Sequence, residues 1–173
     1  VVKVAGYARP AGVPIISFSN DVGSAGPGVF LMGQLPSQSV ERVVSYAFGK
    51  GKRRFAALVP NNVYGQRASA ALQGTVRALG GTVVGIETYD RTSESAAAAA
   101  KRLQAKGAYD SLLIADNGRA AMMVAPHARK FGGKNAQILG VELWNTESAL
   151  AGDANLRGAW YASISDNLYP QFS

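Results

Sequence analysis

Four short β-rich runs recur along the chain at nearly constant spacing, and this spacing constrains the fold more than any other feature. The runs begin at residues 55, 82, 111 and 137, which are 27, 29 and 26 residues apart. One strand followed by a crossover helix takes about 30 residues, whereas antiparallel strands joined by a hairpin need far fewer. The spacing therefore predicts a doubly wound α/β fold with a parallel sheet, whose strands cover residues 55–59, 82–89, 111–115 and 137–140.

The stretches between these runs carry the period of amphipathic helices. Glycines follow the apolar stripes where helices are expected to stop, and Thr92 is a good N-cap for the third helix. Pro126 is predicted to kink the fourth helix or to mark a local break in it. The predicted helices cover residues 40–48, 68–79, 92–107 and 118–131.

Segments of different character flank this repeating block. Residues 12–19 are predicted to form one short buried strand, and the Gly-rich stretch from Asn20 to Gly33 is interpreted as a connection. Residues 158–162 are predicted to form a fifth strand, followed by the polar residues 163–173. The chain is therefore expected to enter from one unit, build a second and leave again.

Composition and the first residues limit the class of protein. With 173 residues, of which 47% are hydrophobic and 17% charged, the chain has enough apolar mass for a globular core. No window reaches the roughly 18 unbroken apolar residues of a membrane span. The start, Val1-Val-Lys-Val4, has neither an initiator Met nor the layout of a signal peptide, so we expect a mature or shortened piece.

A positive net charge of +7 raises the question of an acidic partner. Many of the cations stand at predicted helix C-termini and in the turns before strands, as in Lys50-Gly-Lys-Arg-Arg54, at Lys106 and at Lys130. Cations there favour the helix dipole and stay solvated. No aromatic platform or known reading module accompanies them, so no nucleic-acid partner is expected.

Catalytic and metal-binding signatures are absent from the sequence. It contains no cysteine, no Gly-x-Ser-x-Gly, no Walker-type motif and a single histidine, His127. No catalytic residue, metal site or cofactor is therefore expected, and the chain is predicted not to be an enzyme.

Ligands of open parallel sheets bind at the carboxyl ends of the strands, and these ends can be identified in the sequence. They carry Tyr64, Asn117, Glu142 and Trp144, in the segments 60–64, 116–119 and 141–145 and beside a further end at 90–92. The two aromatic rings can form an apolar wall, the amide can donate and accept, and the carboxylate can hold an ammonium group. The sequence thus predicts a small-molecule site at this edge.

Several segments together resemble one known family. The segments are Gly12-Val-Pro-Ile-Ile-Ser-Phe-Ser-Asn20, Arg53-Arg-Phe-Ala-Ala-Leu-Val-Pro60 with Tyr64-Gly65, Gly140-Val-Glu142, Ala151-Gly-Asp153 and Gly158. In their order and spacing they resemble periplasmic binding proteins of type I. The branch is the leucine/isoleucine/valine-binding-like group of ABC-transporter substrate-binding proteins, which includes proteins labelled penicillin-binding protein activators.

The resemblance implies two doubly wound lobes joined by crossovers and closing on a ligand between them. Residues 1–18 would then be the tail of the first lobe and residues 19–34 a crossover. Residues 35–162 would form most of the second lobe, and residues 163–173 the return crossover.

The resemblance also implies a ligand-binding set. Ser17, Ser19, Asn20 and Asp21 match the first-lobe loop that contacts the carboxylate and ammonium of an amino-acid ligand. Tyr64 matches an aromatic residue that covers the ligand, and Glu142 matches the acid that pairs with its ammonium. Two positions depart from the branched-chain binders: Asn117 replaces an aromatic residue and Asp21 falls near a hydroxyl. Both departures argue against a branched-chain amino acid as the ligand.

These implications give a periplasmic protein, free or lipid-anchored, that binds a small polar, amino-acid-like solute for ABC-type uptake and hands it to a membrane permease. One alternative is a lipoprotein resembling the penicillin-binding protein activators, which acts through a cell-wall synthase. Another is the effector-binding domain of a transcription regulator, and an enzyme of flavodoxin-like or hydrolase type ranks last. The exposed lobe edge is also expected to be able to support a homodimer.

Overall fold

The computed structural model describes residues 2–18, 23, 25–32 and 35–163. Its main feature is a five-stranded sheet in the order β4-β3-β5-β6-β7, in which every pair of neighbouring strands is parallel. The strands are β3 (Arg54–Pro60), β4 (Thr82–Tyr89), β5 (Ser111–Ile114), β6 (Gln137–Gly140) and β7 (Trp160–Tyr161). The predicted parallel α/β fold and its five strands are confirmed.

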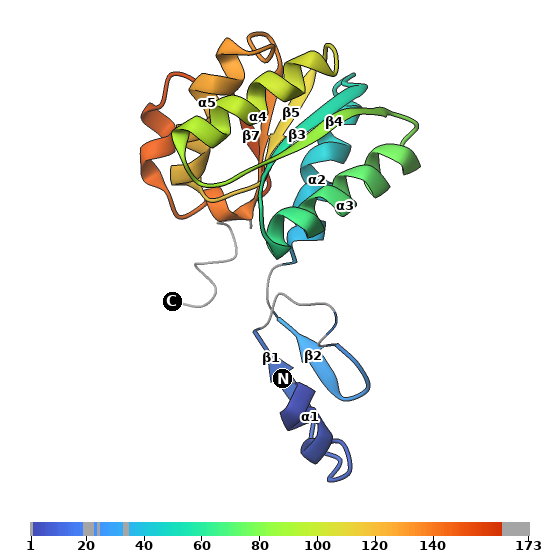
Figure 1. Cartoon of the computed structure of the whole chain (residues 1–173). Coiled ribbons are helices and arrows are strands. Elements are labelled where there is room, and N and C mark those ends of the chain that lie inside the picture. Colours follow the sequence, from blue (N-terminus) through green and yellow to red (C-terminus); the bar gives the residue numbers. More distant parts are fainter. Residues whose placement is uncertain (1, 19–22, 24, 33–34, 164–173) are drawn as a thin grey trace.

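Helices cover both faces of this sheet (Figure 1). On one face lie α2 (Pro36–Gly49) and α3 (Val63–Ala78), and on the other lie α4 (Ser93–Ala105) and α5 (Gly118–Lys130). The helix α5 runs through Pro126 to Lys130, so this proline does not end it. The crossover order places the first turns of α3, α4 and α5 directly after the carboxyl ends of β3, β4 and β5.

Side chains cap these three helices at their first turns. Asn62, Thr92 and Asn117 each accept a hydrogen bond from the backbone N–H three residues further on. Such N-caps satisfy donors that the helix itself leaves unpaired. The carboxyl edge of the sheet therefore has a fixed backbone on which functional side chains can be held.

The core is built on a sheet that is covered on both faces. Every residue of β5 is buried, as are all residues of β3 after Arg54. Against the sheet pack the small side chains of the alanine-rich helix α4, where Ala96 and Ala99 are fully buried. The interpretation of this alanine run as a close-packing helix face fits the structure.

The N-terminal region forms a separate, smaller unit. It contains α1 (Val2–Ala8), β1 (Ile15–Ser17) and β2 (Val29–Leu31), and the two strands pair in parallel in a sheet of their own. The strand in residues 12–19 was predicted. Neither α1 nor β2 was predicted, and β2 lies in the Gly-rich stretch that the sequence analysis treated as a connection. The division into first-lobe tail, crossover, second lobe and return crossover stays a prediction; the five-stranded sheet and its helices lie between Pro36 and Tyr161.

Arginines near the amino ends of the strands donate to backbone carbonyls. Arg53 Nη1 donates to Phe48 O and Lys52 O at 2.6 and 2.8 Å. Arg129 Nη1, at the end of α5, donates to Gly133 O and Ala136 O at 3.0 and 2.8 Å. These two arginines thus bind backbone carbonyls at a helix end and in the turns before strands. No helix among the described residues is long and apolar enough to cross a membrane.

A matched pair of glycines in α3 tests how tightly this helix sits on the sheet. A Cβ atom on Gly65 would collide with the carbonyl oxygen of Pro60, whereas one on Gly74 would meet nothing within 4 Å. We expect Gly65→Ala to lower the free energy of unfolding by about 1–3 kcal/mol through overpacking. Gly74→Ala should raise it by about 0.5–1 kcal/mol, since alanine is the better helix former. Urea unfolding of both variants checks this, and equal shifts would contradict the close approach.

Candidate functional site

The loops at the carboxyl edge of the sheet bring together residues from four different strands. Tyr64 follows β3, Arg91 follows β4, Asn117 follows β5 and Glu142 follows β6. Because the strands are parallel, all four loops emerge at the same edge. This is the edge at which the sequence predicted a ligand site.

Tyr64 and Glu142 are in direct contact across the end of β5. The Tyr64 hydroxyl donates to Glu142 Oε1 at 3.2 Å, and the backbone N–H of Glu142 donates to Ser39 Oγ of α2 at 2.9 Å. The other carboxylate oxygen, Glu142 Oε2, is buried and has no hydrogen-bond partner among the described residues. A buried acceptor without a donor costs about 1–3 kcal/mol, and more when it is charged. The site therefore carries an acceptor whose hydrogen-bonding capacity is unused.

The Tyr64 hydroxyl is held in its protonated form. Burial, followed by the negative charge of Glu142 and the hydrogen bond to it, raises the pKa of Tyr64 well above its ordinary value. The neutral hydroxyl is the form that can donate to the carboxylate. The phenol thus fixes one oxygen of Glu142, while the other accepts no hydrogen bond from the described residues.

Asp116 organises the neighbouring part of the edge. Its side chain is fully buried and accepts from the Tyr89 hydroxyl at 2.8 Å and from its neighbour's backbone N–H, that of Asn117, at 2.8 Å. It also accepts from Arg91 Nε and Nη2 at 3.1 and 2.6 Å. Four donors on one buried carboxylate compensate for its lost hydration. Sequence reasoning placed Asp116 and Arg91 at this edge but assigned them no role.

Two predicted site residues have structural contacts in addition to any ligand role. Asn117 Oδ1 accepts the Ala120 N–H at 2.9 Å as the N-cap of α5. Trp144 is only 3% exposed, its Nε1 donates to Asp116 O at 3.0 Å, and a Cβ on Gly140 would run into its ring. The indole therefore helps to hold the edge together and offers a ligand little surface.

The first-lobe candidates are placed only in part. Ser17 is buried in β1, within the two-stranded sheet. Ser19, Asn20 and Asp21 lie outside the described residues. The structure thus brings Tyr64, Asn117, Glu142 and Trp144 to one edge, and a ligand contact of any of the eight residues stays a prediction.

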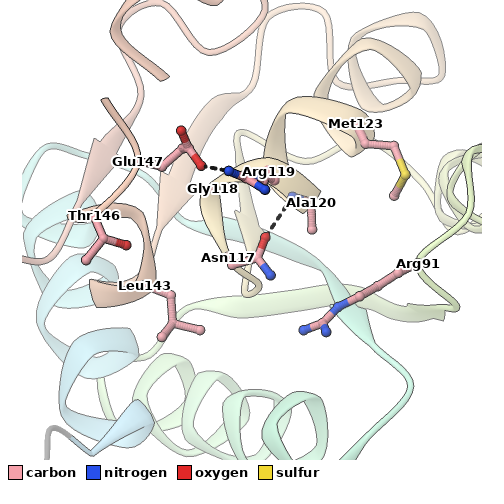
Figure 2. A pocket seen from close by; sticks show the side chains of 9 residues that line it. All are labelled: Arg91, Asn117, Gly118, Arg119, Ala120, Met123, Leu143, Thr146 and Glu147. Atoms are coloured by element: carbon pink, nitrogen blue, oxygen red, sulfur yellow. Dashed lines mark hydrogen bonds and ion pairs between the residues drawn. The ribbon is translucent and has the colours of Figure 1, made fainter. Parts of the chain in front are cut away.

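A hollow of about 570 Å³ opens beside this edge, at the first turn of α5. Figure 2 shows Arg91 and Asn117 among its lining residues, with Arg119 directed toward Glu147. Arg119 Nε and Glu147 Oε2 are 3.1 Å apart, and the Arg119 side chain is largely exposed. Met123 and Leu143 add apolar surface to the lining. A cavity with a few polar groups and some apolar wall is typical of small-molecule sites.

Metal-ligating side chains do not gather in the part of the chain that the structure describes, since no group of three or more His, Asp or Glu residues comes together there. The single histidine, His127, contacts Ser93, with Nε2 and Oγ 2.9 Å apart. This histidine therefore links α5 to the start of α4.

The Tyr89–Asp116 contact leads to a prediction for alkaline pH. Burial, and then the negative charge of Asp116, raises the pKa of Tyr89 above its ordinary value. Above a pH of about 10 the unfolded chain loses this proton while the folded chain keeps it, so the free energy of unfolding falls by about 1.4 kcal/mol per pH unit. Below that pH the contribution is fully present. Tyr89→Phe should make the decline less steep by this amount, measured by urea unfolding between pH 8 and 11. Parallel declines in the variant and the unmodified protein would contradict the assignment.

Comparisons with known proteins agree with this architecture. The family model described as periplasmic binding protein matches residues 1–170. No curated protein matches the chain. Solved structures of similar fold include LpoA from Haemophilus influenzae, with 19% identity and a TM-score of 0.70 over 92% of this chain and 29% of that one.

Two further structures of similar fold are solute- or ligand-binding proteins. One is an extracellular ligand-binding receptor from Verminephrobacter eiseniae, with 19% identity and a TM-score of 0.67 over 83% of this chain and 41% of that one. The other is a branched-chain amino acid ABC transporter periplasmic ligand-binding protein from Burkholderia xenovorans, with 19% identity and a TM-score of 0.61 over 79% and 38%. The chain thus spans about two fifths of these two structures. At such identities the similarity shows the fold, whereas the family match covers nearly the whole chain and implies an extracytoplasmic location. The chain belongs to the periplasmic binding protein family.

Proposed function

We propose that this chain supplies most of one lobe of a solute-binding protein that holds a small, polar, amino-acid-like ligand between two lobes for ABC-type uptake. Family membership supports a binding role, and the proposal involves no chemical step. We also propose the ligand class, the transporter partner and a periplasmic or lipid-anchored position.

The observation that carries the proposal is the unused oxygen of Glu142. One carboxylate oxygen accepts from Tyr64, and the other is buried and accepts from no donor in the part of the chain that the structure describes. An ammonium group supplies both the positive charge and the N–H donors that such an oxygen lacks, and a charge-assisted hydrogen bond of this kind is about twice as strong as a neutral one. The site therefore favours a ligand with a protonated amine.

The other half of the site would come from the N-terminal unit. We propose that Ser17, Ser19, Asn20 and Asp21 contact the ligand's polar groups from the first lobe, with Tyr64 covering it from the second. Contacts from both lobes would favour the closed form of the protein. A membrane permease would then bind that form.

Removing the charge of Glu142 tests the proposal. We expect Glu142→Gln to weaken the binding of free L-amino acids by about 10- to 100-fold, because a hydrogen bond to a charged group contributes about 1.5–3 kcal/mol. N-acetylated counterparts, which lack the ammonium, should bind poorly to both forms. Isothermal titration calorimetry, or NMR shift perturbation for weak ligands, gives these affinities.

Glu94→Gln is the matched control, because Glu94 is an exposed carboxylate in the first turn of α4. It makes the same charge change away from the Tyr64–Glu142 pair and should leave the affinities unchanged. An equal loss in both variants, or no loss in Glu142→Gln, would contradict the ammonium site.

A second candidate function is a role through a protein partner, such as a cell-wall synthase. The similarity to LpoA, which covers 92% of this chain with a TM-score of 0.70, favours keeping it. In that case the carboxyl edge would be covered by protein, and a homodimer through this edge would bury the same residues. Failure of every amino acid in the titration to bind the folded protein would favour this candidate.

A further inference from the structure

The guanidinium of Arg91 is held in one orientation at the carboxyl edge. Its Nε and Nη2 donate to the two oxygens of Asp116 at 3.1 and 2.6 Å. This two-point contact fixes the plane of the group as well as its position. Asp116 itself is fully buried, whereas the Arg91 side chain is 53% exposed, so the arginine reaches from a rigid base into accessible space.

Arg91 has more N–H donors than the two groups that bind Asp116. The carboxylate already accepts from Tyr89 and from the Asn117 backbone as well as from the arginine, so its negative charge is shared among four donors. Arg91 Nη1 has no partner among the described residues, and a guanidinium carries five N–H groups in all. Arg91 therefore has N–H groups without a partner among the described residues, and the Asp116 carboxylate that orients it already accepts four hydrogen bonds.

Arg91 lines the open hollow at the start of α5. The hollow measures about 570 Å³, and Met123 and Leu143 give it apolar surface (Figure 2). Arg119 stands at its rim, paired with Glu147 while 87% of its side chain is exposed. An exposed ion pair of this kind contributes little to stability, so Arg119 is free to turn toward an anion in the hollow.

The Arg91 hollow and the Tyr64–Glu142 pair lie on opposite sides of the end of β5. Tyr64 belongs to α3, and Glu142 contacts α2 through Ser39, so that pair lies on the face covered by α2 and α3. Arg91 lies in the short segment that joins β4 to α4, and the hollow also includes the first turn of α5, so the hollow lies toward the face covered by α4 and α5. The edge thus presents an acceptor for a cation on one side and spare guanidinium donors on the other.

We propose that Arg91, oriented by Asp116, binds a carboxylate of the ligand, so that the site selects amino-acid-like solutes with a second carboxylate remote from the ammonium. This inference rests on the proposed function and adds the ligand class. The planar pair of oxygens in a carboxylate matches the planar donors of a guanidinium, which a tetrahedral anion matches less well. Met123 and Leu143 would contact the carbon chain between the two ends.

L-glutamate and L-glutamine form the matched probe pair, because they differ only in a remote carboxylate against an amide. We expect the protein to bind glutamate at least tenfold more tightly than glutamine in isothermal titration calorimetry. Arg91→Gln should reduce this preference to less than twofold. Arg77→Gln, at an exposed position in the last turn of α3, makes the same charge change and should keep the preference.

Four results would overturn the inference. One is an equal affinity for glutamate and glutamine in the unmodified protein, and another is a preference that survives in Arg91→Gln. A third is full preference in Arg91→Lys, which keeps the charge without the planar donors. Competition with inorganic phosphate covers the other anion class, and displacement of glutamate at equal concentration would contradict selection of a carboxylate.

Glutarate separates this inference from the proposed function, since it has two carboxylates and no ammonium. Binding of glutarate that depends on Arg91 but not on Glu142, together with no effect of Glu142→Gln on any amino acid, would leave the carboxylate site standing while the ammonium site fails. Amino-acid binding that depends on Glu142 but not on Arg91 would support the ammonium site and contradict the carboxylate site.

Discussion

The buried carboxylate of Asp116 is the contact on which the carboxyl edge depends. It takes hydrogen bonds from the last residue of β4, from Arg91 just beyond it and from the backbone that opens α5, while its own carbonyl accepts from Trp144 after β6. A carboxylate at this depth is stable only because it is saturated with donors. Removing one donor would leave part of the negative charge of Asp116 uncompensated. Because its hydrogen-bond partners lie at the ends of different strands, Asp116 holds the ends of three strands in one geometry. Arg91, Asn117 and Trp144 each donate to Asp116, so this residue holds the loops that follow β4, β5 and β6.

The sequence predicted the main fold well because the signals for it are repeated. Strand runs spaced by 26 to 29 residues, with one apolar helix stripe in each interval, leave few arrangements other than a parallel doubly wound sheet. The strand β2 could not be found in the same way, because a three-residue strand is shorter than any window in which a period can be seen. Its neighbouring glycines favour a turn, and only the pairing with β1 makes Val29–Leu31 a strand.

The sequence predicted the edge of the sheet at which the candidate site lies, but not the side-chain contacts within it. The sequence placed both Tyr64 and Glu142 directly after strands. These strands, β3 and β6, are not neighbours in the sheet, because β5 lies between them. No local sequence pattern shows that the Tyr64 hydroxyl reaches the Glu142 carboxylate across β5. Trp144 illustrates the opposite case. An aromatic residue in a loop suggested a wall for a ligand, whereas the close approach of Gly140 and the acceptor at Asp116 draw the indole into the core. Both outcomes depend on the order of the strands, which spacing alone does not fix.

The unused oxygen of Glu142 connects the stability of this fold with its proposed binding role. A buried acceptor without a donor lowers the stability of the free protein, and a fold selected only for stability would be expected to pair it. Ser39 holds the backbone of Glu142, and Tyr64 holds one side-chain oxygen, so the carboxylate cannot turn away without losing the hydrogen bond from Tyr64. A ligand that donates to Oε2 would remove this cost on binding, and the free energy so recovered would add to its affinity. The contact partners of Glu142 come from two helices on one face, so the proposed ligand would meet an acceptor that is already held in place, and little ordering would remain when it binds.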